Sequence, residues 1–292
     1  MINLNDSSIN PGYLGNRQNG MGGRLSFTSA TPVTLADVIG ATTIYYVPHV
    51  GSSILLWNGS NFISRSFTEI SLTLGTLANN TNYDVFVYDN AGVLTLEAIA
   101  WTNDTTRATP FTRQGGILIK FPDNRTYLGT FRTTSTTTTE DSRSKRFLWN
   151  LYNRVNRELY KPYANATWTY TSTAVRQANG NTANQLELVC GQVENAISLA
   201  FSLFASGGNT QAMAWSIGED STVSPHADAD VAILSAASAT TATLITLPSS
   251  IGYHKYCALE ALFSGSGTQT MQASVAGTSV SSAYRMRGEC FA

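Results

Sequence analysis

Short runs of alternating apolar and polar residues follow one another along most of the chain, separated by Gly, Asn, Ser and Pro. In the run YDVFVY, residues 83–88, Val85 and Val87 fall on one face of an extended strand and Phe86 falls on the other. The dipeptide Asn58-Gly59 separates two further runs, SILLW and NFISRSF, and is a strong hairpin-turn signal. This period of two predicts an all-β protein.

The runs fall into two groups along the chain. Residues 24–134 hold seven to nine of them at the spacing of a sandwich or barrel. We therefore expect residues 23–139 to form an N-terminal β domain, either a β-sandwich or a barrel-like fold. The stretch TTSTTTTE, Thr133 to Glu140, is of low complexity and is typical of a linker or a long exposed loop.

The second group begins near Ala166 and runs to the C-terminus, with eight or nine strand-like segments and Gly, Ser and Asn at the turns. This number of antiparallel strands predicts a jelly roll. We expect residues 164–292 to form this C-terminal domain, and the last segment, YRMRGECFA, to tie the end of the chain into a sheet.

Residues 140–163 differ from both groups because six Lys and Arg fall in EDSRSKRFLWNLYNRVNRELYK. The apolar positions make one helical stripe, which predicts an amphipathic connector helix with a start at Asp141 or Ser142 and a stop at Pro162. A strand is the alternative, but Asn153 would interrupt its apolar face. We expect the stripe to pack against two sister subunits as a trimer interface; its residues are Phe147, Leu148, Leu151, Tyr152, Val155 and Leu159.

Residues 1–22 are rich in Asn, Gly and Ser and carry little apolar surface, so they cannot fold alone. They form either a disordered tail or an attachment arm that orders against a partner. They also lack the apolar core of a signal peptide, and no run of 18 apolar residues predicts a membrane span. We therefore expect no membrane insertion.

The low charge of the chain limits the classes of partner that we expect. Only 13% of the residues are charged, about half of the usual share, and the net charge is -1. A dedicated nucleic-acid-binding protein carries a basic excess, so we expect no nucleic-acid partner. A polar surface built from Thr, Ser, Asn and Gln suits crowded assemblies and glycan-binding faces.

Candidate catalytic groups are few. No nucleophile, phosphate-binding or metalloprotease motif is present, and we expect no catalytic, metal or cofactor site. The segment SPHADAD places His226, Asp228 and Asp230 at alternate positions, where they could supply metal ligands, but a solvated loop is the better interpretation. A polysaccharide-cleaving pair would need Glu219 or Asp220 held near Glu194 or Glu260.

Aromatic residues among hydroxyls and amides are candidates for stacking on sugar rings, although a core or a subunit interface is the better interpretation of each one singly. Trp168 and Tyr170 alternate in TWTYTS, and Trp101 precedes TNDTT. We take these three as the glycan-binding candidates. Trp57, beside the Asn58-Gly59 turn, belongs to the same group of aromatics.

Several strings resemble a known class of proteins. They are IYYVPHVGSSILLWNGSNF, AWTNDTTRATP and YLGTFRTT followed by EDSRSKRFLWNLYNRVNR, and the resemblance covers roughly residues 24–161. The class is that of virion structural proteins of tailed bacteriophages, usually described as tail-fibre, head-fibre or appendage proteins.

This resemblance implies a homotrimer that is assembled in the host cytoplasm and located in the virion. Its N-terminal region, residues 1–22 here, would attach to capsid, neck or tail proteins, and its C-terminal domain would be distal. The function expected is that of a structural fibre, spike or decoration protein. The alternative is an adhesin that recognises host surface glycan through the C-terminal head, and a polysaccharide depolymerase is less favoured.

Overall fold

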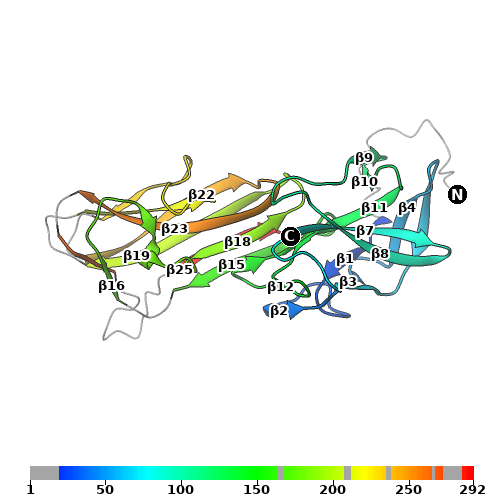
Figure 1. The fold of residues 1–292 in the computed structure, drawn as a ribbon, viewed down its shortest axis with the longest axis horizontal. Coiled ribbons are helices and arrows are strands. Elements are labelled where there is room, and N and C mark those ends of the chain that lie inside the picture. Colours follow the sequence, from blue (N-terminus) through cyan, green and yellow to red (C-terminus); the bar gives the residue numbers. More distant parts are fainter. Residues whose placement is uncertain (1–19, 164–166, 207–211, 235–237, 265–266, 272–284) are drawn as a thin grey trace. The chain divides into compact units, whose positions relative to one another are not determined.

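A computed structural model describes residues 20–163, 167–206, 212–234, 238–264, 267–271 and 285–292 (Figure 1). The described chain is almost entirely strands and turns, and its helical turns are single 3-10 turns such as Ala178–Gly180. The prediction of an all-β protein is confirmed. The attachment arm falls mostly on residues 1–19, which lie outside the described residues.

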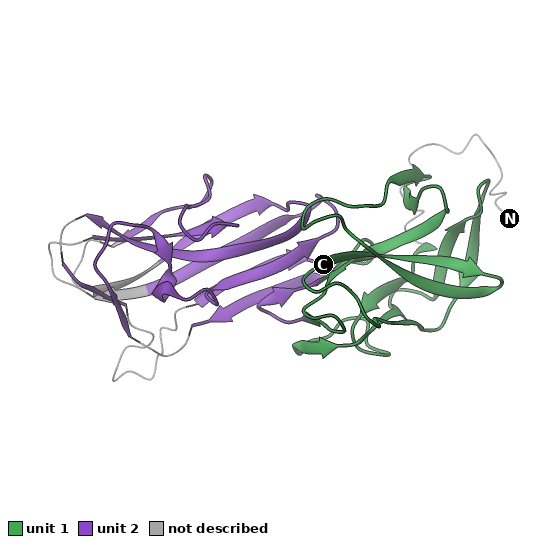
Figure 2. Cartoon of the chain, viewed as in Figure 1, with its two compact units in different colours: residues 1–140, 148–154 green, residues 141–147, 155–292 purple. Residues whose placement is uncertain are grey.

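The chain divides into two compact units (Figure 2). Unit 1 comprises residues 1–140 and 148–154, and unit 2 comprises residues 141–147 and 155–292. The polypeptide thus passes from one unit to the other after residues 140, 147 and 154. Residues 140–163 are divided between the two units and form no separate connector.

Unit 1 contains two sheets and a hairpin. The strand order is β1-β3-β6 in the small sheet and β8-β7-β11-β10-β9 in the larger one, where β14 also pairs with β11. The hairpin β4–β5 places Trp57 opposite Phe62, as Asn58-Gly59 predicted. The bounds are β1 (Gly23–Ser26), β2 (Val38–Ala41), β3 (Thr43–Pro48), β4 (Ser53–Trp57), β5 (Phe62–Ser66), β6 (Ile70–Thr73), β7 (Asn82–Asn90), β8 (Val93–Ala100), β9 (Phe111–Gln114), β10 (Ile117–Lys120), β11 (Arg125–Arg132) and β14 (Leu148–Asn150).

Both faces of the larger sheet of unit 1 are buried along β7. Residues Asn82 to Val87 of β7 are all buried, so the alternation in the sequence does not separate a solvent-exposed face from a buried face. Val85 and Val87 face one side and Phe86 the other, and all three are fully buried. Covering both faces requires loops and other strands on each side of the sheet.

Unit 2 contains two further sheets. One has the order β13-β18-β23-β20-β21 with β17 on β23, and the other β15-β25-β19-β24-β16 with β22 on β19. Between the described strands of unit 2, β13 pairs with β18 in parallel and the other pairs are antiparallel. The bounds are β13 (Lys145–Arg146), β15 (Asn156–Pro162), β16 (Trp168–Tyr170), β17 (Arg176–Gln177), β18 (Gln185–Cys190), β19 (Ala196–Ser206), β20 (Ala212–Glu219), β21 (Ala232–Leu234), β22 (Ser238–Pro248), β23 (Gly252–Ser264), β24 (Gln269–Met271) and β25 (Arg285–Phe291); β12 (Thr139–Asp141) spans the change of unit.

In unit 2, β19 buries alternate residues, whereas β23 is buried on both faces over much of its length. In β19, Ile197, Leu199 and Phe201 are buried, and in β23 the run from Tyr256 to Leu262 is buried throughout. The final strand β25 pairs with β15 on one side and β19 on the other, so the C-terminus is tied into a sheet. In Figure 1 these three strands run side by side.

The predicted amphipathic helix over residues 140–163 is wrong. These residues form β13, β14 and β15 and the turns between them. All seven residues of β15 find partners in β25, and the turn residue Asn153 takes a φ of 55°. Ladder partners from distant strands satisfy the backbone groups that a helix would satisfy locally, so tertiary pairing overrides the local periodicity.

The expected linker of threonines is also ordered in unit 1. Thr133 and Thr139 form a bridge and are fully buried. Their hydroxyls donate to the carbonyl oxygens of Ala78 at 2.7 Å and Arg132 at 2.5 Å. The repeated threonines therefore close a tight turn, since each buried hydroxyl has a backbone acceptor.

Candidate functional site

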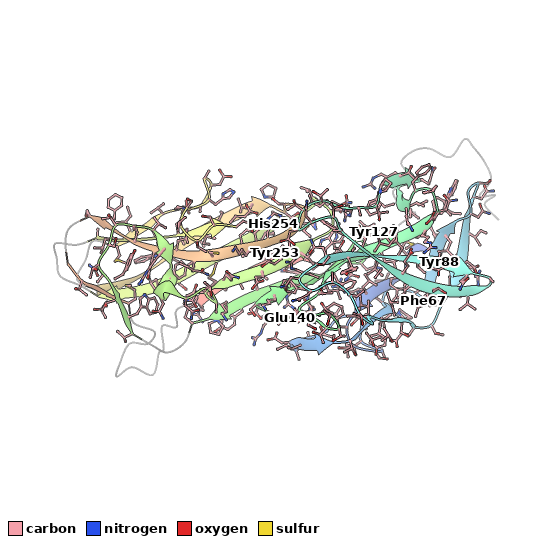
Figure 3. All side chains as sticks on the ribbon, viewed as in Figure 1. Phe67, Tyr88, Tyr127, Glu140, Tyr253 and His254 are labelled. Carbon is pink, nitrogen blue, oxygen red and sulfur yellow. The ribbon has the colours of Figure 1, made fainter. Side chains whose placement is uncertain are left out.

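Three turns of unit 1 border an open cavity of about 380 Å³. They are the tip of the β4–β5 hairpin, the end of β7 and the β10–β11 turn, and we call this site the turn cavity. Its lining includes Trp57, Asn58, Ile63, Tyr88, Asp123 and Asn124. Figure 3 shows Tyr88 on β7.

Local sequence explains how the turns are held. The Asn58 side-chain oxygen accepts hydrogen bonds from the backbone N–H of Ser60 at 2.9 Å and Asn61 at 2.8 Å, which closes the hairpin. Asn124 takes a φ of 60°, which asparagine tolerates better than most residues. The Thr126 hydroxyl donates to the Leu55 carbonyl oxygen at 3.1 Å and so ties the hairpin to β11.

Every charged residue that lines the turn cavity has an ionic partner. Arg65 pairs with Asp89 and also donates to the Gly92 carbonyl oxygen at 2.9 Å. Arg125 pairs with Glu97. Asp123 pairs with Lys120 at 2.6 Å, and the hydrogen bond from Lys120 lowers the pKa of the Asp123 carboxyl below its usual value.

The aromatic groups of the turn cavity are partly exposed. The guanidinium of Arg125 lies 4.1 Å from the centre of the Tyr88 ring. The Trp57 ring lies 5.0 Å from the Phe62 ring, and Ile63 is 45% exposed. The cavity thus combines apolar surface with the indole N–H, the tyrosine hydroxyl and two asparagine amides.

Little in the sequence marks this site. The Asn58-Gly59 turn and Trp57 were recognisable, but Tyr88, Asp123 and Asn124 lie 29 or more residues away from them. The pairing of β7 with β11 joins Tyr88 to the β10–β11 turn, and the Thr126 bond to Leu55 brings the β4–β5 hairpin beside them.

The glycan-binding candidate Trp101 is buried in unit 1, with 5% of its surface exposed. The Arg107 guanidinium lies 4.5 Å from its ring centre and also pairs with Asp84 at 2.8 Å. Burial raises the pKa of Asp84, while Arg107 and Thr130 act in the opposite direction. This cluster holds the loop after β8 and leaves no open indole face.

Trp168 and Tyr170 are also engaged, in unit 2. The Trp168 indole N–H donates to Glu260 Oε2 at 2.8 Å, and only 8% of the residue is exposed. The Arg176 guanidinium lies 3.8 Å from the centre of the Tyr170 ring, and the Tyr170 hydroxyl donates to the Ala174 carbonyl oxygen at 2.5 Å. The structure therefore uses both aromatics to anchor β16 and the following loop.

Both carboxylate oxygens of Glu260 accept hydrogen bonds at this anchor. Besides Trp168, its carboxylate accepts hydrogen bonds from Arg176 Nε at 2.8 Å and the Asn179 backbone N–H at 3.0 Å. Burial raises the pKa of Glu260, and the contacts with Trp168 and Arg176 oppose that rise.

In the ladder, Glu260 lies opposite Trp215 and Glu219 lies opposite Tyr256. Four positions of strand separate Glu219 from Glu260, an offset of about 13 Å along the backbone, and their carboxylates have different partners.

Glu219 and Asp220 belong to a different cluster at the end of β20. His254 Nδ1 lies 2.8 Å from Asp220 Oδ2, and its Nε2 lies 3.2 Å from the Ile251 carbonyl oxygen. Tyr256 donates to Glu219 at 3.1 Å. Figure 3 shows His254 on β23, and Glu194 lies exposed in the turn between β18 and β19.

The segment with His226, Asp228 and Asp230 makes a turn beside this cluster. His226 Nε2 lies 3.4 Å from Glu219, and its Nδ1 accepts the Asp228 backbone N–H at 3.0 Å. Among the described residues, no group of three or more His, Cys, Asp or Glu side chains is placed to hold a metal ion.

The six candidate interface residues are placed inside one chain. Phe147, Leu148, Leu151, Tyr152 and Leu159 are buried, and Val155 is half-buried. Leu148 lies in β14 opposite Phe131, and Leu159 lies in β15 opposite Gly288. The stripe depended on a helix, and without the helix these side chains serve the cores of the units.

The comparisons with known proteins give no family. No family model matches the sequence, and no curated protein gives a significant match. Within the described residues, no helix is long and apolar enough to cross a bilayer.

Three solved structures show distant likeness. Dimeric latent PorU from Porphyromonas gingivalis is 10% identical with a TM-score of 0.28, over 74% of this chain and 24% of that one. A Cry1Da core variant from Bacillus thuringiensis is 9% identical with a TM-score of 0.21, over 85% and 48%. A carbohydrate-binding module of the β-sandwich superfamily is 13% identical with a TM-score of 0.17, over 87% and 97%. The chain thus spans about a quarter of PorU and about half of the toxin, and these low scores assign it to no family.

Proposed function

We propose that the protein is a structural component of a tailed-bacteriophage particle, which forms a homotrimeric fibre, spike or decoration appendage. The observation that carries this proposal is the likeness of the strings in residues 24–161 to such proteins. The all-β architecture and the low charge support it. In this proposal residues 1–22 attach the trimer to capsid, neck or tail proteins, and residues 164–292 form a jelly-roll head.

A patch on unit 2 supports self-association. Val231, Ile233 and Phe263 are 45% to 59% exposed. Ile233 and Ala261 lie opposite Ala214 on neighbouring strands, so they share one face of the sheet. Val231 and Phe263 border a groove of about 280 Å³ on this face. We call Val231, Ile233 and Phe263 the sheet patch.

A second copy of the chain is the occupant that we propose for the sheet patch. The net charge of -1 provides no long-range repulsion between copies. Exposed apolar patches on β-sheets commonly mark contacts between proteins.

Two measurements test the structural role. Analytical ultracentrifugation of the full chain should give a mass of three chains, and a monomer at every concentration would contradict the trimer. Mass spectrometry of purified phage particles from the natural source should detect the chain in fixed stoichiometry with the capsid protein. Its absence from the particles would contradict the virion role.

Binding of host surface glycan is the second candidate function. The C-terminal aromatics do not favour it, because Trp168 is buried and Tyr170 is covered by Arg176. The observation that favours it is the turn cavity of unit 1. We assign no catalytic role in this proposal, and an assay for new reducing ends after incubation with host capsule would reveal one.

A further inference from the structure

We propose that the turn cavity of unit 1 binds an uncharged saccharide. This inference goes beyond the structural role and does not depend on it, because the cavity is built within one unit of one chain. It differs from the expectation drawn from the sequence, which placed glycan binding on Trp101, Trp168 and Tyr170.

The dimensions of the cavity fit a small ligand. Its volume of about 380 Å³ lies within the roughly 300–1,000 Å³ that small-molecule sites occupy. Walls come from separate turns, and the Thr126 bond to Leu55 fixes two of them to each other. A site held by neighbouring strand ends needs little ordering when a ligand binds.

The balance of charge selects an uncharged ligand. Two arginines and two aspartates line the cavity, so their formal charges cancel. Arg65 and Asp89 neutralise each other, and Arg125 and Asp123 have Glu97 and Lys120 as partners. Because each of these charges already has a partner of opposite sign, none is left over to attract a charged ligand.

The groups that remain match a polyhydroxylated ring. Asn58 uses its side-chain oxygen within the turn, which leaves its NH2 group to donate. The Asn124 amide, the Tyr88 hydroxyl and the Trp57 indole N–H have no hydrogen-bond partner among the described residues. The exposed side chain of Ile63 adds apolar surface for the C–H face of a sugar. Amides and hydroxyls beside apolar surface are how proteins bind neutral rings.

The experiment uses the full chain and defined saccharides. Saturation-transfer NMR would be recorded with neutral chitotriose, maltotriose and lactose, and with acidic sialyllactose and trigalacturonic acid. We expect saturation transfer to at least one neutral saccharide and none to the acidic pair. The dissociation constant of the neutral binder would then be measured by calorimetry.

Two variants locate the binding. Asn124→Gly removes the amide but keeps a residue suited to the φ of 60°, and Tyr88→Phe removes only the hydroxyl. We expect each to weaken binding about tenfold. The matched controls are Asn80→Gly, at an exposed residue with a φ of 50°, and Tyr170→Phe in unit 2, and both should bind as the parent does.

Three results would overturn the proposal. They are no transfer to any neutral saccharide, transfer to the acidic saccharides alone, and unchanged affinity in the Asn124→Gly and Tyr88→Phe double variant with a parental circular dichroism spectrum. None of these results bears on the virion role, which the ultracentrifugation and particle analysis test separately.

Discussion

At the scale of single residues, His254 shows how neighbours set a charge. Both of its ring nitrogens face oxygen acceptors, Asp220 Oδ2 and the Ile251 carbonyl oxygen. Only the protonated imidazole can donate from both nitrogens. Burial disfavours that charge, but the hydrogen bond and charge of Asp220 outweigh it and raise the pKa of His254. Burial of Asp220 is likewise outweighed by His254 and Lys255, which lower the Asp220 pKa.

The pH dependence of stability follows from these shifts. A raised folded pKa means that the His254 contribution is fully present below the unfolded pKa of about 6.5 and is lost as the pH rises through the folded value. The Asp220 contribution is present above about pH 3.9 and is lost as the pH falls through its lowered folded value.

Urea unfolding of the parent should therefore show stability that falls above about pH 6.5, relative to His254→Gln. Glu219 and His226 are ionisable groups beside this pair, so NMR signals of the His254 ring itself should be used to assign the raised pKa. A parallel pH profile in parent and variant would contradict this account.

A second prediction concerns the buried carboxylate of Glu260. Arg176→Met removes its ionic partner, so Glu260 must either keep its charge with only the hydrogen bonds from Trp168 and Asn179 or take up a proton. We expect the free energy of unfolding to fall by about 3 kcal/mol in denaturant melts. The control is Arg65→Met, which breaks a partly exposed ion pair in unit 1 and should cost under about 1 kcal/mol. Equal losses in the two variants would contradict the role given to burial.

At the scale of elements, residues 140–163 show the limit of local patterns. The spacing of Leu148, Leu151 and Leu159 fits a helix, but it also arises when short strands and turns each bury one side chain. In β15 the actual period is two, since Arg157 and Leu159 are buried and Glu158 is exposed. Asn153 was the visible sign of a turn. Its side chain donates to the carbonyl oxygens of Met21 and Gly23, which no local signal could reveal.

Close approach of strands leads to a third prediction. A Cβ added at Gly129 would lie 2.2 Å from the Trp149 carbonyl oxygen, so β14 could not pair with β11 in its present register. We expect Gly129→Ala to lower the free energy of unfolding by about 1–3 kcal/mol. Gly51→Ala is the control, because its nearest atom outside its chain neighbours would lie 3.7 Å away. Thermal unfolding of both variants measures the difference, and a Gly129→Ala variant as stable as the Gly51→Ala control would refute the close contact.

At the scale of the whole molecule, the question is how copies associate. The stripe expected to join subunits is mostly buried within the chain, whereas the sheet patch is exposed. The proposal therefore moves the contact from residues 140–163 to the outer face of β20, β21 and β23. The third strand of this face, β23, also carries His254 and Glu260.

The fourth prediction tests that contact. Phe263→Asp places a charge in the sheet patch and should shift the full chain from trimer to monomer, with at least a tenfold rise in the concentration for half association. Val93→Asp is the matched control, since Val93 is 65% exposed in unit 1 and lies outside the patch. Sedimentation velocity over a concentration series distinguishes them. Trimers that persist in Phe263→Asp would show that another surface joins the subunits.

The sequence by itself determined the strand content and many of the turns. Alternation of side chains and signals such as Asn58-Gly59 act over a few residues, so they can be read without knowledge of the fold. The same local alternation correctly predicted the strand that contains YDVFVY and the C-terminal strand.

Tertiary structure alone decided which strands pair, which aromatics are buried and where a cavity forms. From the sequence, Trp168 was a candidate for either sugar stacking or a core or interface position, and the fold placed Glu260 against its indole N–H, 92 residues along the chain. The turn cavity likewise depends on turns that are distant in sequence. Such contacts are set by the competition of many possible pairings for the same backbone groups, and that competition is resolved only when the whole sheet forms.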